Sequence, residues 1–179
     1  MAKRCYVLDA TVLIQGLSPT AMDGQDLFTV PEVMEEVKEG EISAIRLETA
    51  ISSRRLRKRR PSRQAIKAIG DVARDLGEEP ALSDTDSALL ALALDLRMEG
   101  RDVAIISDDY AVQNVATRLK IPFIAVSSSG IAQTFTWSLY CTACRRPYPP
   151  SDRTTCPICG TALKRRVVGR EGLRATGRD

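Results

Sequence analysis

Short apolar segments alternate along the chain with longer stretches in which apolar residues recur every three or four positions. The apolar runs predict buried β-strands at residues 4–8, 27–30, 103–106 and 123–126. The three-to-four spacing predicts helices at residues 31–40, 41–52, 62–77, 83–100 and 110–119, with a short helix over 10–16. This alternation of strands and helices indicates an α/β fold with a mainly parallel sheet flanked by helices.

The helix predicted from residue 83 onward is almost entirely apolar, yet its first turn contains two carboxylates, Asp84 and Asp86. Ser83 stands at the N-cap position and Asp86 follows three residues later, which is the spacing of a capping box. Asp86 also faces the positive end of the helix dipole. Capping alone explains the pattern, so any further role for Asp86 depends on what the fold brings near it.

Other carboxylates follow predicted strands. Asp9 comes directly after the first strand, and Asp108 and Asp109 follow the strand at residues 103–106. Ligands of parallel sheets gather outside the carboxyl ends of the strands, so we expect Asp9, Asp86 and Asp109 at one edge. Each of them has a plain alternative as a turn or cap residue. Converging together without a cation, they would repel one another and raise one another's pKa.

The absence of histidine from the 179 residues narrows the chemistry of this edge. It excludes His-based acid–base catalysis, Ser-His-Asp and Cys-His nucleophiles, and His-ligated metal centres. A cluster of carboxylate oxygens suits Mg²⁺ or Mn²⁺ rather than zinc. Such an ion orients a water, lowers the pKa of that water and stabilises in-line attack on a phosphodiester. We therefore expect metal-dependent phosphodiester hydrolysis.

Four of the five cysteines form two Cys-x-x-Cys pairs separated by eleven residues. This spacing predicts a zinc ribbon, in which four thiolates close a tetrahedral, structural site with no open position. Gly160, after the last cysteine, permits the tight turn of a zinc knuckle. In so small a module the metal contributes about 10 kcal/mol or more to folding. The expected ligands are Cys141, Cys144, Cys156 and Cys159.

Charge is distributed unevenly between the two parts of the chain. Residues 1–136 have a net charge of −3 and residues 137–179 a net charge of +6. The basic part, with its aromatic side chains Trp137, Tyr140 and Tyr148, offers charge and stacking surfaces suited to RNA. The alternative for these aromatics is that they pack the ribbon against the larger unit. The expected RNA-binding residues are Arg145, Arg146, Lys164, Arg165 and Arg166.

A second basic stretch lies within the larger unit. Residues 54–63 contain seven basic side chains in ten positions. Such a run is typical of a solvated or edge segment, and the alternative is a strip that contacts phosphates.

The composition shifts divide the chain into a larger α/β unit at residues 1–130, a linker at 131–136, the ribbon at 137–168 and a polar tail at 169–179 that we expect to be disordered. No apolar run approaches the roughly 18 residues of a membrane span, and the first residues lack a signal-peptide pattern. We therefore expect a cytoplasmic protein.

Four segments resemble, in order, the acidic motifs of PIN-domain ribonucleases. They are residues 6–11 (YVLDAT), 29–37 (TVPEVMEEV), 82–93 (LSDTDSALLALA) and 107–116 (SDDYAVQNVA). With the added ribbon, residues 4–166 are similar to the archaeal branch of the NOB family, endonucleases that mature the 3′ end of small-subunit ribosomal RNA. The resemblance implies a PIN-like nuclease domain over residues 1–130. It also implies precursor ribosomal RNA, the pre-small ribosomal subunit and other assembly factors as partners, with no membrane.

The resemblance also implies which acids bind the Mg²⁺ or Mn²⁺ and carry out catalysis: Asp9, Glu36, Asp86 and Asp109. Neighbouring acids that share or replace these roles are the alternatives, namely Asp84, Asp108 and Glu35. Two other functions remain open. One is a non-catalytic RNA-binding assembly factor whose acids only cap helices, and the other is a PIN-type toxin ribonuclease, although such toxins typically end without a ribbon.

Overall fold

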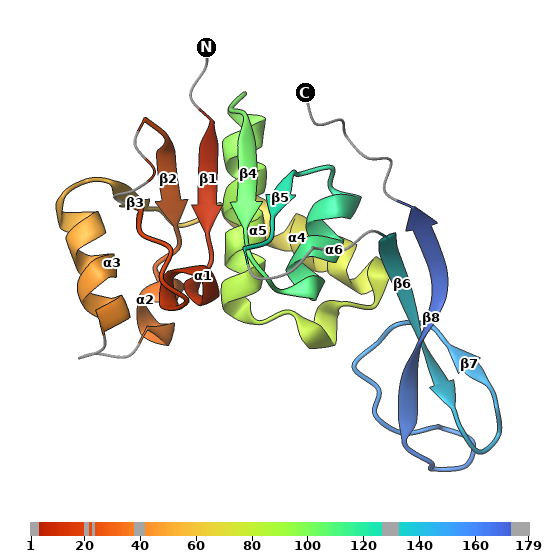
Figure 1. Ribbon diagram of the computed structural model, residues 1–179. Coiled ribbons are helices and arrows are strands. Elements are labelled where there is room, and N and C mark those ends of the chain that lie inside the picture. The colour runs from red at the N-terminus through yellow and green to blue at the C-terminus, as the bar shows by residue number, and fades with distance from the viewer. Residues whose placement is uncertain (1–3, 20–21, 23, 38–41, 127–132, 173–179) are drawn as a thin grey trace.

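The larger unit is built on a five-stranded parallel sheet. The computed structural model describes residues 4–19, 22, 24–37, 42–126 and 133–172. The strands follow the order β3-β2-β1-β4-β5 across the sheet (Figure 1). Their bounds are β1 Cys5–Leu8, β2 Asp26–Thr29, β3 Leu56–Lys58, β4 Val103–Ile106 and β5 Phe123–Ile124. The predicted α/β class with a mainly parallel sheet is confirmed.

Helices flank this sheet. They are α1 Ala10–Ile14, α2 Glu32–Glu36, α3 Ile42–Ser52, α4 Arg63–Leu76, α5 Asp84–Met98 and α6 Tyr110–Arg118, with a 3₁₀ turn, η2, at Glu79–Ala81. The central helix α5 lies behind β4 in Figure 1 and packs against β1, β4 and α4. Because α5 is covered from several sides, its apolar residues surround the helix instead of forming one stripe. The position of α5 fixes its acidic first turn beside the core.

Two segments differ from the expected elements. The helix predicted over residues 31–40 ends at Glu36, because Val37 is extended and buried in the core; residues 38–40 lie outside the described part. The basic run at residues 54–63 contains the edge strand β3, which pairs in parallel with β2. Only Leu56 of β3 is buried, so the strand has no alternating pattern that the sequence could reveal.

The C-terminal unit is a three-stranded antiparallel sheet in the order β7-β6-β8. Its strands are β6 Gln133–Cys141, β7 Pro147–Tyr148 and β8 Leu163–Gly172. Strand β6 begins inside the segment predicted as a linker, and β8 continues past residue 168 as its pairing partner. The proposed division into units stays a prediction, and residues 173–179 lie outside the described part. No helix in the described ranges combines the length and apolar character that crossing a bilayer requires.

Candidate functional site

Asp9 lies at the carboxyl end of β1, where the chain turns into α1. The side chain is buried, with 4% of the residue exposed, and Ser107 Oγ donates a hydrogen bond of 2.7 Å to Asp9 Oδ2. Burial raises the pKa of Asp9, the hydrogen bond from Ser107 opposes that rise, and the negative charge of Asp86 adds to it. A buried carboxylate with a second acid nearby is poorly stabilised by the protein alone, and a cation would relieve this cost.

Asp86 takes part in the predicted capping box. Ser83 Oγ accepts a hydrogen bond from the Asp86 backbone N–H at 3.1 Å, while the Ser83 N–H and hydroxyl donate to Asp86 Oδ2 at 2.9 and 2.7 Å. Both bonds to the carboxylate end on Oδ2, so capping is compatible with a ligand at Oδ1. Burial raises the pKa of Asp86 against the bonds from Ser83, and the charges of Asp109 and Glu36 raise it further.

The two neighbouring acids after β4 have different partners. Asp109 Oδ1 caps α6 by accepting the backbone N–H groups of Ala111 and Val112 at 2.7 and 3.1 Å. Asp108 Oδ1 accepts the backbone N–H of Val126 at 2.8 Å, beyond the end of β5. The negative charge of Asp109 raises the pKa of Asp86.

Helix α2 carries two adjacent acids. Glu35 and Glu36 are both exposed, and the negative charge of Glu36 raises the pKa of Asp86. Asp84 is exposed in the first turn of α5. The charge of Asp86 thus raises the pKa of Asp9, and the charges of Asp109 and Glu36 raise the pKa of Asp86.

The spacing of these acids is wider than that of a closed metal cage. Among the described residues, only the four ribbon cysteines form a group of three or more metal-ligating side chains with ligand atoms within 4.8 Å of one another. Widely spaced carboxylates suit an open site, in which water and a phosphate complete the coordination of a divalent ion. Asp9 is buried and Asp86 is half-buried, and the mutual repulsion of their charges fits such an ion.

Ser107 is a site residue that the sequence reasoning missed. Its hydroxyl is fully buried, donates to Asp9 and accepts the backbone N–H of Asp109 at 3.1 Å. The Gln113 side chain donates to the Ser107 carbonyl at 3.0 Å. The available signal was a polar residue at the end of an apolar strand, directly before two acids. Ser107 holds the Asp9 carboxylate and the Asp109 backbone, the first and last of the four expected acids, in one arrangement.

The cysteines of the ribbon fit a zinc ion. Sγ atoms of Cys141 and Cys159 lie 3.5 Å apart, and those of Cys144 and Cys156 lie 3.6 Å apart. Tetrahedral Zn–S bonds of about 2.3 Å place sulfur atoms about 3.8 Å apart, close to these distances. Although burial opposes ionisation, the Tyr148 hydroxyl donates to Cys156 at 3.1 Å and contributes to lowering the pKa of that thiol to about 6. A thiolate is the form that binds zinc.

The two zinc knuckles have matching backbones but different residues at their turns. The Arg145 N–H donates to the Cys141 carbonyl at 3.0 Å, and the Gly160 N–H donates to the Cys156 carbonyl at 2.9 Å. Both residues have left-handed backbones, with φ of 60° for Arg145 and 72° for Gly160. Glycine adopts this conformation without strain, whereas an arginine adopts it only with strain. The exposed side chain of Arg145 is therefore held at the knuckle at a conformational cost.

The basic residues of the ribbon lie on two faces. Lys164 and Arg166 alternate with Arg165 along β8, and Arg166 lies over the ring of Tyr140 at 5.3 Å. Arg165 instead forms an ion pair of 2.9 Å with Glu78 of the larger unit. The structure thus separates Arg165 from the other expected RNA-binding residues.

In the basic run of residues 54–63, Arg57 and Arg59 form ion pairs at the sheet. Arg57 lies 3.6 Å from Asp26, and Arg59 pairs with Glu99 beyond the end of α5. These exposed pairs contribute little to stability. The alternative of a phosphate-contacting strip stays a prediction for this run.

Comparison with known proteins agrees with this architecture. The sequence profile of a family described as "PIN domain of ribonuclease" matches residues 6–96. A protein named Endoribonuclease Nob1 from Methanothermobacter thermautotrophicus is 37% identical over 161 residues, which cover 89% of this chain and 91% of that protein. Its namesake from Pyrococcus abyssi is 39% identical, over 92% of this chain and 94% of its own length.

A third relative has a different name. The protein called Ribonuclease VapC1 from Thermoplasma acidophilum is 30% identical over 168 residues, which cover 94% of this chain and 81% of that protein. All three similarities extend over both units of the chain.

Proposed function

Because the chain belongs to the PIN-domain ribonucleases and within them to the Nob1 endoribonucleases, we propose that it cleaves precursor small-subunit ribosomal RNA near its 3′ end during ribosome maturation. It is an endoribonuclease, and endoribonucleases of this kind use divalent metal ions. The proposal covers the substrate, the choice of Mg²⁺ or Mn²⁺, and the residues that act. It rests on one observation: Asp9 and Asp109 lie together at the carboxyl ends of β1 and β4, where the Ser107 hydroxyl donates to Asp9 Oδ2 and accepts the Asp109 backbone N–H.

The proposed metal ligands and catalytic groups are Asp9, Glu36, Asp86 and Asp109. A bound Mg²⁺ or Mn²⁺ supplies a water of lowered pKa and neutralises charge on the scissile phosphate. Asp9 stays fixed at the end of β1 through the Ser107 hydroxyl, and Asp86 stays fixed through its capping box. Rigid carboxylates of this kind set the coordination geometry before the RNA arrives.

Asp84 and Asp108 take supporting roles in this proposal, and Glu35 stays the alternative to Glu36 on α2. The hydrogen bond of Asp108 to Val126 ties the segment after β5 to the site. Asp84 strengthens the negative first turn of α5 beside the helix dipole.

The ribbon is proposed to hold one structural zinc and to bind RNA. Four thiols at suitable distances support the zinc. Exposed basic side chains beside Tyr140 provide phosphate contacts and a stacking surface, which are the features that single-stranded RNA uses. The proposed partners are precursor ribosomal RNA and the pre-small ribosomal subunit, with other assembly factors, and the cytoplasmic location stays a prediction.

A cleavage assay tests the proposal. Purified wild-type protein is incubated with an RNA that spans the 3′ end of the precursor, once with Mn²⁺ and once without added metal. The Asp86→Asn variant is incubated with the same RNA under the same two conditions. We expect one metal-dependent product from the wild-type protein and none from the variant, which keeps the capping bonds and RNA affinity. Equal cleavage by the variant contradicts the assigned role of Asp86.

The same assay separates the alternatives. RNA binding without any metal-dependent product would favour the non-catalytic assembly factor. Cleavage of unrelated RNAs at rates equal to the precursor would favour a toxin-type ribonuclease.

A further inference from the structure

Glu78 receives hydrogen bonds from both units of the protein. Its side chain is buried, with 6% exposed, at the junction between α4 and η2. Oε1 accepts the Trp137 indole N–H and the Asn114 amide, both at 2.7 Å, and Oε2 accepts a guanidinium N–H of Arg165 at 2.9 Å. Trp137 and Arg165 belong to the ribbon sheet, whereas Asn114 belongs to α6. One carboxylate therefore joins three elements.

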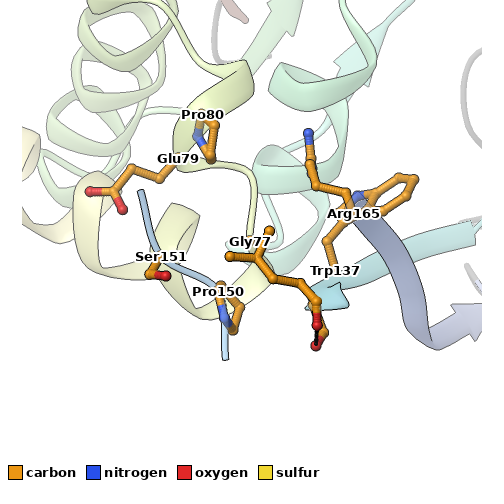
Figure 2. A pocket seen from close by; sticks show the side chains of 9 residues that line it. Gly77, Glu79, Pro80, Trp137, Pro150, Ser151 and Arg165 are labelled. Atoms are coloured by element: carbon orange, nitrogen blue, oxygen red, sulfur yellow. Dashed lines mark hydrogen bonds between the residues drawn. The ribbon is translucent and has the colours of Figure 1, made fainter. Parts of the chain in front are cut away.

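The ribbon residues at this junction also hold each other. The Arg165 guanidinium lies over the Trp137 ring, 4.6 Å from the centroid. Such a pair is stronger where water is partly excluded, as it is beside Glu78. Figure 2 shows the junction, with Gly77 and Pro80 of the larger unit near Trp137 and Arg165 of the ribbon.

Gly77 lets the ribbon backbone come into direct contact with the end of α4. It caps the helix with a φ of 71°, and a Cβ at this position would lie 2.8 Å from the Trp137 carbonyl oxygen and 2.9 Å from Trp137 Cβ. Backbone atoms cannot move aside as a flexible side chain does. Gly77 and Glu78, adjacent in sequence, thus form a seat for Trp137.

This seat is continuous with the elements that carry the acids. The Glu78 carbonyl accepts the backbone N–H groups of Ala81 and Leu82, directly before the cap of α5 that contains Asp86. Asn114, held by Glu78, lies in the helix that Asp109 caps. The ribbon is therefore seated on the same framework that positions two of the site carboxylates.

We propose that Glu78 is a positioning residue that locks the ribbon onto the nuclease unit, so that RNA held by the ribbon reaches the acids at a fixed distance and register. This inference rests on the proposed function, because it takes the RNA bound by the ribbon to be the substrate that the acids cleave. It assigns Arg165 and Trp137 to this lock and leaves the opposite face of the ribbon, with Tyr140 and Arg166, for RNA. When the RNA is held in one placement, one phosphodiester lies at the acids, and cleavage occurs at that position.

The lock itself is tested without any RNA, by ¹⁵N relaxation of the zinc-bound protein. We expect both units of the wild-type protein to tumble with one correlation time, and two separate times in Gly77→Ala. The matched control is Gly100→Ala, because Gly100 has a φ of 81° but no atom within 4 Å of an added Cβ. Both substitutions place an alanine in a left-handed backbone conformation, which is strained, but only Gly77→Ala also displaces the ribbon. Two correlation times in the wild-type protein would overturn the proposal.

Cleavage by Glu78→Gln tests the consequence. The amide keeps an acceptor for Trp137 and Asn114 but presents a donor to Arg165. On a long precursor RNA we expect kcat/KM to fall about tenfold and secondary cleavage positions to appear, whereas a single-stranded oligonucleotide too short to reach the ribbon is cleaved within about twofold of the wild-type rate. Glu79→Gln is the control, since its exposed side chain pairs with Arg74 within the larger unit.

The outcomes separate the two proposals. Unchanged product positions and rates in Glu78→Gln contradict the lock, even when the wild-type protein cleaves as proposed. A wild-type protein that tumbles as one body but cleaves no RNA contradicts the proposed function and supports the lock.

Discussion

The hydroxyl of Ser107 donates a hydrogen bond of 2.7 Å to Asp9 Oδ2 across the carboxyl ends of two neighbouring parallel strands. The same hydroxyl accepts the backbone N–H of Asp109, so its orientation is fixed from both sides. A carboxylate held in this way loses little freedom on binding a cation. Outer-shell hydrogen bonds of this type orient metal ligands and tune their affinity.

Ser107→Ala is expected to lower metal-dependent cleavage. Loss of an outer-shell partner costs about 10- to 100-fold in metal affinity or activity. The loss should be partly restored at high Mn²⁺, because Asp9 keeps its charge but not its orientation. Cleavage rates measured over a Mn²⁺ titration check this, with Ser52→Ala as the control, since Ser52 bonds only to its own helix in the described structure. An unchanged Mn²⁺ dependence contradicts the role of Ser107.

Asp9→Asn is expected to lower cleavage activity and to raise the stability of the protein without added Mn²⁺. The asparagine carbonyl can still accept from Ser107, while the buried negative charge and its repulsion by Asp86 are removed. We expect cleavage to fall by more than the roughly 100-fold that follows loss of an outer-shell partner. We expect the melting temperature without added Mn²⁺ to rise at pH 7, measured by scanning calorimetry on zinc-loaded protein. A lower melting temperature would show that the charge of Asp9 stabilises the fold.

The raised pKa values of Asp9 and Asp86 predict a distinct pH dependence of stability. The folded state holds protons on these acids at pH values where the unfolded chain, with an aspartate pKa of about 3.9, has released them. The free energy of unfolding contributed by this pair therefore falls as pH rises from the unfolded value through the raised folded values. Added Mn²⁺ should remove that fall, since a cation stabilises the ionised acids.

Thermal melts between pH 4 and neutrality, with and without Mn²⁺, measure this effect. Chelators are avoided because they would also remove zinc from the ribbon. Asp9→Asn provides the control, with a smaller fall in stability. The same pH slope with and without Mn²⁺ would contradict binding of the ion at these acids.

Local signals in the sequence specify most of the framework of the larger unit. Helix α4 is predicted from end to end, because Ser62 caps its start and Gly77 ends it with a left-handed backbone. Asp9, Asp86 and Asp109 are predicted together because each follows a strand or opens a helix at the same edge. Their convergence on one metal ion stays a prediction.

The inter-unit contacts could not be predicted in this way. Glu78 is a charged residue in a loop, and its burial depends on partners 36 to 87 residues away in sequence. Likewise, Arg165 and Arg166 are the same residue type in adjacent positions, and only the pairing of β6 with β8 shows which of them faces the larger unit. Tertiary placement, and not local pattern, determines these roles.

Arg145→Gly is expected to stabilise the ribbon and weaken RNA binding at the same time. Glycine removes the cost of a left-handed arginine, about 1 kcal/mol, and leaves the turn to Cys141 intact. It also removes an exposed cation from the zinc knuckle. Zinc-release midpoints in denaturant and RNA affinity by fluorescence anisotropy measure the two effects. Arg146→Gly, at the exposed next position, is the control and should weaken binding without the gain in stability.

Arg165 and Arg166 offer a last comparison, because they are adjacent, carry the same charge and face opposite sides of β8. Arg166→Ala removes a cation beside Tyr140 and should lower RNA affinity, reducing the slope of log affinity against log salt by about 1. Arg165→Ala should leave that slope nearly unchanged, because its guanidinium pairs with Glu78. It should instead broaden the set of cleavage positions on a long RNA, since the ribbon is no longer held. Equal salt slopes for the two variants would place both arginines on the RNA and contradict the division of the ribbon into two faces.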